Sequence, residues 1–186
     1  MIRKLGMAAI LACGMLFGTH MGAAMAADLE NTLYLETKDG RVVIEMRPDL
    51  APRHVERIKE LAREKFYDGL KFHRVIAGFM VQTGDPNGDG TGGSGQHLPP
   101  EFSSEPHVRG VVSMARASSP ASADSQFFIV LDEATYLDNK YTVWGKVTSG
   151  MEFVDMIKKG DSNRNGSVRD PDAIVSMRVA ADVEKK

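Results

Sequence analysis

Short apolar and alternating runs recur along the chain and predict a mainly β protein. Loops rich in glycine, proline and serine separate these runs, and Lys-Asp-Gly at positions 38–40 reads as a hairpin turn between the first two. Eight segments have the length and composition of strands: 32–36, 42–46, 71–75, 79–83, 111–115, 125–130, 142–147 and 173–179.

Only two segments show helical features. The first begins at Pro52, where a missing N–H costs nothing, and its apolar positions recur at helical spacing: Val55, Ile58, Leu61 and Ala62. The second is short, 151–158, with Gly160 as its stop. Many short strands with two helices favour a closed antiparallel barrel, because closure removes exposed strand edges.

The first 26 residues differ from the rest and predict a secretory signal peptide. Arg3 and Lys4 precede an apolar stretch, and a weakly polar segment follows in which Ala24 and Ala26 hold small-residue positions. A basic start, an apolar middle and a small-x-small end are typical of a cleavable export signal. We therefore expect cleavage after Ala26, which leaves residues 27–186 as a single domain.

Cys13 raises the alternative of a lipid-anchored form. Lipoprotein signals end in a small residue followed by cysteine, but Leu11 stands where a smaller residue is usual. The apolar run is also too short and interrupted for a bilayer span of about 20 residues. We favour cleavage without stable membrane association, and a mature chain without cysteine or disulfide. The periplasm is the expected compartment, with secretion to the medium as an alternative.

The net charge and the spacing of the histidines argue against two kinds of ligand, nucleic acid and a catalytic metal ion. Without Arg3 and Lys4 the chain holds 21 basic and 25 acidic residues, a net charge of about −4. No basic stripe is visible, so nucleic acid is not an expected partner. No two of the five histidines have the spacing of metal ligands, so metal catalysis is not expected.

The densest set of candidate groups lies in residues 72–93, FHRVIAGFMVQTGDPNGDGTGG. Arg74 stands just before the apolar pair Phe79 and Met80 and the amide of Gln82. Neither a metal-ligand cluster nor an activated nucleophile is visible there. One fixed cation beside an apolar patch suits a reaction that breaks no bond.

Strand alternation assigns faces to the neighbouring side chains. It places Phe72 and Arg74 on one face and His73 on the other, where a lone histidine between apolar residues is expected to be a hydrogen-bonded core residue. Phe127 and Phe128 are adjacent, so a strand directs them to opposite faces. One of the two enters the core, and the other needs a second apolar environment or a ligand.

Two loops resemble motifs of other chemistries. Residues 88–93 satisfy G-x-G-x-x-G, but a dinucleotide site needs a helix directly after it, and 94–100 contains a proline pair. Residues 85–96 and 161–172 match the first half of an EF-hand loop, but neither has Glu at its twelfth position. Turn-forming loops are favoured for both. Weak cation binding by the second loop stays open.

Together the segments resemble the cyclophilin family of peptidyl-prolyl cis–trans isomerases. FHRVIAGFMVQTGD, GTGG, SQFFI and IVSM occur in the family's order and approximate spacing, and the resemblance covers residues 28–179. It implies a closed eight-stranded antiparallel β-barrel capped by two α-helices. It also implies catalysed rotation about X–Pro bonds, without a cofactor, in proline-containing polypeptides.

The resemblance carries over to individual residues. Catalysis is expected to depend on Arg74, Phe79 and Gln82. Further residues are expected to line the pocket for the proline ring and the adjoining peptide groove: Met80, Gly90, Ala115, Arg116, Ala117, Gln126, Phe128, Tyr136, Leu137 and Tyr141. A monomeric isomerase that assists the folding of exported proteins is the favoured function. The alternative is a non-catalytic proline-peptide-binding chaperone or scaffold, which would have no need of the arginine.

Three positions depart from the family pattern. Tyr136 stands where many members have a tryptophan that helps to bind the inhibitor cyclosporin, so weak cyclosporin binding is expected. Tyr141 stands where many members have histidine, and it can still supply a flat apolar wall and a hydroxyl. Arg116 replaces the usual asparagine. If mainly the backbone binds the peptide there, little changes, while the side-chain charge would shift peptide preference towards acidic neighbours.

Overall fold

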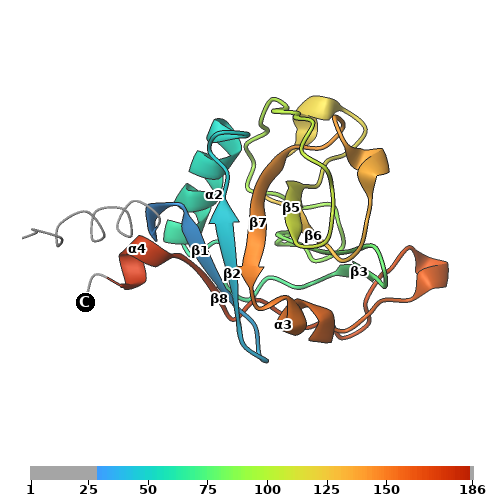
Figure 1. Cartoon of the computed structure of the whole chain (residues 1–186). Coiled ribbons are helices and arrows are strands. Elements are labelled where there is room, and N and C mark those ends of the chain that lie inside the picture. Colours follow the sequence, from blue (N-terminus) through green and yellow to red (C-terminus); the bar gives the residue numbers. More distant parts are fainter. Residues whose placement is uncertain (1–28, 185–186) are drawn as a thin grey trace, which may run out of the picture.

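Eight antiparallel strands form one curled sheet in the computed structural model, which describes residues 29–184 (Figure 1). The strands are β1 (Thr32–Glu36), β2 (Arg41–Met46), β3 (Arg74–Ile76), β4 (Met80–Thr83), β5 (Val111–Met114), β6 (Phe127–Val130), β7 (Val143–Ser149) and β8 (Ser176–Val179). Their order in the sheet is β3-β4-β6-β5-β7-β2-β1-β8, and every pairing is antiparallel. The predicted mainly β class and strand number are confirmed.

Closure of the barrel is weaker than predicted. β3 and β8 stand at the two ends of the strand order, and three backbone hydrogen bonds with one isolated bridge join the segments before them. Phe72 N donates to Asp172 O at 2.9 Å, and Ile174 N donates to Leu70 O at 2.9 Å. Pro171 in this segment has no N–H to donate, which disfavours a regular ladder there. The predicted strand 71–75 accordingly begins only at Arg74.

Three α-helices accompany the sheet among the described residues: α2 (Pro52–Arg63), α3 (Met151–Met156) and α4 (Ala180–Val183). The two predicted helices are α2 and α3, and the second ends two residues earlier than expected. α2 buries its predicted apolar stripe and packs against β7 and β8, while α3 packs against β2. None of the helices in residues 29–184 is both long and apolar enough to cross a bilayer.

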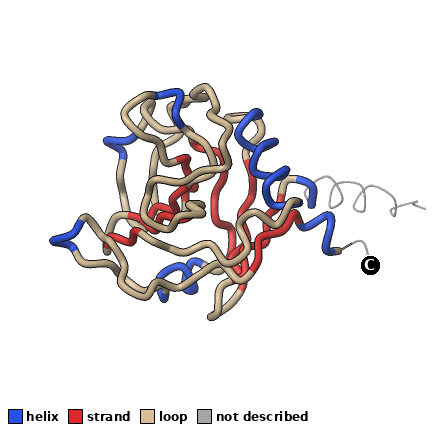
Figure 2. The backbone as a smooth tube through the Cα atoms, turned by 180° about the vertical axis from the view of Figure 1, so that it is seen from behind, coloured by secondary structure: helices blue, strands red, loops and turns tan. Residues whose placement is uncertain are grey.

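A distant carboxylate caps the beginning of α2. Ala51 supplies no side-chain cap, but the Glu101 carboxylate accepts the backbone N–H groups of Arg53 at 3.2 Å and His54 at 3.1 Å. The same carboxylate lies 2.7 Å from Nδ1 of His54, which is fully buried. Burial lowers the pKa of His54, and Glu101 opposes that shift. This contact ties the long loop 84–110 to the helix. Loops and turns make up much of the backbone between the strands and helices (Figure 2).

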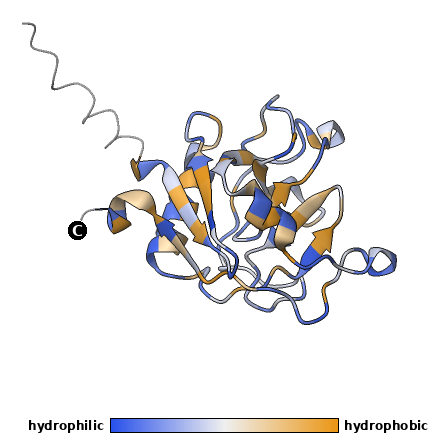
Figure 3. Cartoon of the chain, turned by 60° about the horizontal axis from the view of Figure 1, so that its bottom comes forward, coloured by the Kyte–Doolittle hydropathy of each residue, from blue (hydrophilic) through white to orange (hydrophobic). Residues whose placement is uncertain are grey.

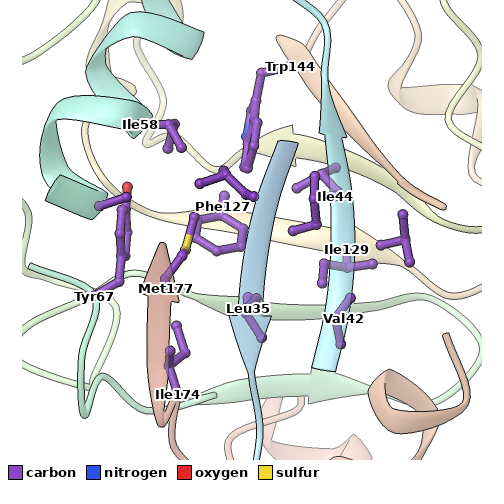
Figure 4. Packing of buried hydrophobic residues seen from close by; sticks show 14 of the residues in the cluster. Leu35, Val42, Ile44, Ile58, Tyr67, Phe127, Ile129, Trp144, Ile174 and Met177 are labelled. Atoms are coloured by element: carbon purple, nitrogen blue, oxygen red, sulfur yellow. The ribbon is translucent and has the colours of Figure 1, made fainter. Parts of the chain in front are cut away.

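The main core lies between the sheet and α2 (Figure 4). Phe127 meets Trp144 edge-on with ring centroids 5.4 Å apart and Tyr67 edge-on at 5.6 Å. Its neighbour Phe128 belongs to a second buried cluster with Met80. Alternation along β6 therefore sends the two phenylalanines to separate apolar environments, as predicted.

Apolar residues concentrate on the strands, while the connecting loops are more hydrophilic (Figure 3). The second buried cluster consists of Met80, Val111, Phe128, Val130, Ala134, Leu137 and Val143. Because it includes residues that the sequence assigned to a ligand pocket, it marks the face of the sheet on which the candidate site is built.

Candidate active site

Register across four neighbouring strands brings predicted site residues into one row. Arg74 on β3 pairs with Gln82 on β4, and Gln82 pairs with Phe128 on β6. Phe128 pairs in turn with Ser113 on β5. Paired residues of antiparallel strands project to the same side of the sheet. A cation, an amide and an aromatic ring therefore lie side by side.

Three hydrogen bonds fix the guanidinium of Arg74. Its Nη1 donates to Gln82 Oε1 at 3.0 Å. Its Nη2 donates to Asn165 Oδ1 at 2.9 Å, and its Nε donates to the Asn165 carbonyl oxygen at 3.0 Å. Partial burial lowers the pKa of Arg74, while Tyr141 and Tyr136 act in the opposite direction. Arginine nevertheless stays charged at any working pH, so the site holds a permanent cation with a set direction.

The charge of Arg74 has no carboxylate partner in the part of the chain that the structure describes. Within residues 29–184, none of the ion pairs includes Arg74. Arg178, by contrast, pairs with Asp68 at 2.6 Å. Because its partners are neutral oxygens, the guanidinium keeps its full charge for a substrate.

Two side-chain amides connect Arg74 to the glycine-rich loop. Gln82 accepts from Arg74 through Oε1, so its Nε2 is free to donate to Gln126 Oε1 at 2.9 Å. Gln126 Nε2 donates in turn to the carbonyl oxygens of Gly90 at 3.1 Å and Gly92 at 2.8 Å. Each bond sets the orientation of the next amide. The relay therefore holds the loop at a fixed position beside the cation.

The glycine-rich loop folds around the carboxylate of Asp85. That carboxylate accepts the backbone N–H groups of Asn87, Asp89, Gly90 and Gly92. Burial by itself raises the pKa of Asp85, but the N–H donors outweigh burial and hold the pKa below its usual value. The loop resembling half an EF-hand is thus organised by its own backbone.

His73 is buried, as predicted, while its expected hydrogen bond is reduced to a weak interaction with the Lys71 backbone that raises its pKa against the larger effect of burial. Neither of its ring nitrogens makes a hydrogen bond of standard geometry among the described residues, and burial lowers its pKa. The charge of Asp85 acts on this ring, yet the Asp85 oxygens already serve four backbone donors. The predicted shared face of Phe72 and Arg74 fails, because the strand begins at Arg74 and Phe72 lies in the main core.

An apolar pocket lies next to the guanidinium. Met80, Phe128 and Leu137 are buried in one cluster, and Phe79 and Tyr141 are partly buried against it. The rings of Phe128 and Tyr141 meet edge-on with centroids 5.8 Å apart. A cavity of about 290 Å³ opens where the pocket meets the cation, and it is lined by Arg74, Met80, Gln82, Ala115, Arg116, Phe128, Tyr141 and Asn165.

Tyr136 forms the outer rim of this pocket. Its ring centroid lies 5.9 Å from that of Phe79, and the residue is 60% exposed. The departure from tryptophan therefore falls on an exposed edge, where the smaller ring presents less apolar surface.

A second cavity of about 280 Å³ adjoins the pocket. Five of the predicted groove residues line it: Gly90, Ala115, Arg116, Ala117 and Gln126. Gln82, Ala115 and Arg116 line both cavities. All thirteen predicted site residues thus lie in or beside one continuous site.

The Arg116 side chain lines both cavities. Its guanidinium lies 4.7 Å from the centroid of the Tyr141 ring, an arrangement that gives a cation–π contact. Nε donates to Lys140 O at 3.2 Å, and Nη1 donates to Ala117 O at 3.0 Å. These contacts fix a second cation in the lining of the groove.

Sequence reasoning missed Asn165. It lies in the loop 161–172, in the left-handed backbone conformation that asparagine tolerates, with φ 54°. From the sequence, this loop is expected at most to bind a cation weakly. Asp161 Oδ1 accepts a hydrogen bond from the backbone N–H of Asn163 at 2.9 Å. The side chain of Asn165 accepts a hydrogen bond from Arg74. No group of three or more His, Cys, Asp or Glu side chains in residues 29–184 is placed to hold a metal ion.

Comparisons with known proteins identify the family of the chain. Residues 32–179 match the family model described as cyclophilin type peptidyl-prolyl cis-trans isomerase/CLD. The chain belongs to this family. A probable peptidyl-prolyl cis-trans isomerase of Brucella suis is 54% identical over 173 residues, covering 87% of this chain and 88% of the relative. Peptidyl-prolyl cis-trans isomerase B of Bacillus subtilis is 45% identical over 133 residues, covering 70% of this chain and 92% of the relative.

Solved cyclophilin structures share the fold. A cyclophilin of Hirschia baltica has a TM-score of 0.75 at 28% identity, covering 92% of this chain and 84% of the relative. A Cryptosporidium parvum cyclophilin, crystallised in the presence of the dipeptide Ala-Pro, has a TM-score of 0.73 at 28% identity. That alignment covers 80% of this chain and 98% of the relative. The fold and the family of this cyclophilin are therefore established together.

The contact between Asn165 and Arg74 generates a test. We expect Asn165→Gly to lower kcat for an Ala-Pro peptide about tenfold, because one bond that aims the guanidinium is lost. Glycine accommodates the positive φ, so the backbone conformation is retained. Asp170→Gly is the matched control, since Asp170 has φ 50° in the same loop and makes no bond to Arg74. Equal kcat values for the two variants would contradict the role of Asn165.

Proposed function

We propose that this cyclophilin catalyses cis–trans rotation about X–Pro bonds in polypeptides that fold after export. The observation that carries the proposal is the Arg74 guanidinium, held by Gln82 and Asn165 at the edge of an apolar pocket. Rotation breaks no bond, so a directed cation and a hold on the proline ring are sufficient chemistry.

The barrier to rotation comes from resonance. An X–Pro bond has partial double-bond character, and its rotation faces a barrier of roughly 20 kcal/mol. In the twisted state the prolyl nitrogen regains a lone pair. The guanidinium of Arg74 can donate to that lone pair, which neither planar isomer offers. The site therefore binds the twisted state more tightly than the two ground states and lowers the barrier.

The pocket and the groove hold the two sides of the rotating bond. Met80, Phe128 and Leu137 offer an apolar environment for the proline ring. In the groove, Ala115 N donates to Gln126 O and Ala117 N donates to Ser122 Oγ. The backbone between them, at Arg116, makes no such bond within the described residues and can pair with the peptide. With the ring held in the pocket, the remaining peptide is the part that turns.

Replacement of Arg74 separates the enzyme from the non-catalytic binder. We expect Arg74→Ala to lower kcat/KM for an Ala-Pro peptide about 100-fold, the usual effect of removing one aimed donor. Peptide affinity should change much less, because the pocket is intact. Arg109→Ala, which removes an exposed pair with Asp155, is the matched control. Equal and slow rates for wild type and Arg74→Ala would leave only the chaperone or scaffold alternative.

The charge of Arg116 supports a preference for acidic residues beside proline. An exposed ion pair contributes about 0.2–1 kcal/mol, so we expect Glu-Pro peptides to exceed Lys-Pro peptides up to about fivefold in kcat/KM. The difference should shrink in high salt, which screens exposed charges. Arg116→Gln should remove it. A preference that persists in Arg116→Gln would assign the selectivity to another group.

The smaller rim residue supports weak cyclosporin binding. Tyr136 offers less apolar area than tryptophan at this exposed edge. Inhibition by cyclosporin, followed in the same isomerisation assay, is therefore expected only well above nanomolar concentrations.

The proposal of export rests on the sequence pattern of residues 1–26, which lie outside the described residues. Its basic, apolar and small-residue parts support cleavage after Ala26 and release into the periplasm. We expect N-terminal sequencing of the protein recovered from cells to begin at Ala27. A chain beginning at Cys13 with a bound lipid would establish the anchored alternative, and an intact Met1 would exclude processing.

A further inference from the structure

Like that of His54, the side chain of His107 is fully buried. It lies next to the proline pocket, and the proposed mechanism makes no use of it. It lies in the loop that precedes β5. Its ring is nearly parallel to that of Phe128, with an interplanar angle of 21° and centroids 6.3 Å apart. Phe128 lines the pocket, and His107 is not among the residues that line this cavity, so the imidazole packs on the pocket wall from inside the protein.

Both ring nitrogens of His107 have partners. Nδ1 lies 2.8 Å from Asp138 Oδ1, and the backbone N–H of His107 donates to the same oxygen at 2.8 Å. Nε2 lies 3.1 Å from Ser113 Oγ, which donates to Thr142 O at 2.9 Å. The result is a buried chain of hydrogen bonds from Asp138 through the imidazole to Thr142.

Each end of this chain reaches a different part of the pocket. Asp138 directly follows Leu137 at the end of the 3-10 turn Thr135–Leu137, which carries pocket residues. Ala134 N also donates to His107 O at 2.8 Å, which fixes the beginning of that turn. At the other end, Thr142 directly follows Tyr141. One imidazole thus connects the turn, the aromatic wall and the Tyr141 segment.

We propose that His107 is a positioning residue that sets the width of the proline pocket. It fixes Phe128 through ring contact, Leu137 through Asp138, and Tyr141 through Ser113 and Thr142. None of these contacts involves Arg74 or Gln82. The inference rests on the proposed isomerase function, because the pocket is assigned to the proline ring.

This division of contacts predicts a division of kinetic effects. The pocket holds the proline ring in the planar and the twisted states alike, so loosening it weakens binding of both. Loss of such uniform binding raises KM and leaves kcat nearly unchanged. A change that disturbs Arg74 lowers kcat instead. The ratio of the two effects therefore distinguishes positioning of the pocket from positioning of the cation.

The test uses replacements that retain different parts of the imidazole. His107→Phe keeps an aromatic ring and removes both hydrogen bonds. His107→Asn keeps a polar donor near the position of Nδ1 and so retains the link to Asp138. We expect His107→Phe to raise KM for an Ala-Pro peptide about fivefold, as for loss of one or two buried hydrogen bonds. His107→Asn should restore part of that loss, and kcat should stay within about twofold in both.

His54→Phe is the matched control for general destabilisation. His54 is also fully buried, with Nδ1 2.7 Å from the Glu101 carboxylate, but it lies at the start of α2. We expect it to lower Tm by a similar amount and to leave KM unchanged. If His107→Phe does not fold, Asp138→Ala tests the same hydrogen bond. It removes the acceptor at the less buried end of the series of hydrogen bonds.

The outcomes separate this inference from the proposed function. An inactive wild-type protein would overturn the isomerase function itself. An active wild type with equal KM values for wild type and His107→Phe, or for wild type and Asp138→Ala if the first variant does not fold, would overturn the role of His107. A KM increase of the same size in His54→Phe would also overturn it, since destabilisation alone would then be sufficient.

Discussion

The guanidinium of Arg74 is fixed by the hydrogen bonds that it donates to Gln82 and Asn165, two residues that lie far apart along the chain. A cation can stabilise a twisted peptide bond only if it is already aimed, since reorganising it would consume the stabilisation. Much of the surrounding structure serves that aim. The β3–β4 register supplies Gln82, and the loop after α3 supplies Asn165. The amide of Gln126 accepts a hydrogen bond from Gln82 and donates one to the glycine-rich loop, which fixes the loop relative to Arg74.

Strand alternation relates this chemistry to the stability of the fold. Phe127 and Phe128 are adjacent on β6, and one packs on Trp144 in the main core while the other enters the pocket. The same alternation lets four strands contribute to one face without breaking the core. A catalytic face can therefore be built on a rigid sheet, with no need for a mobile loop to carry the cation.

Sequence alone predicted those parts of the site that lie in continuous motifs. Arg74 and Gln82 fall within nine residues, and Phe128 lies in SQFFI, so the resemblance to the cyclophilin family that these motifs carry could assign all three to the site. Asn165 could not be found in this way, because it meets Arg74 across 91 positions through a loop in the left-handed conformation. His107 likewise acts through contacts that only the folded chain creates. The weak closure of the barrel depends on a few backbone hydrogen bonds between residues 69–72 and 172–174, which the alternation of apolar residues along the strands does not predict.

A double-mutant cycle on Arg74 and Asn165 tests the central claim most directly. The rate of cis–trans exchange in a bound Ala-Pro peptide, measured by exchange NMR, reports rotation separately from binding. If Asn165 acts only by aiming the guanidinium, Asn165→Gly slows exchange in the wild type but has no further effect once Arg74→Ala is present. Losses that multiply independently in the double variant would contradict the account, because Asn165 would then contribute without Arg74.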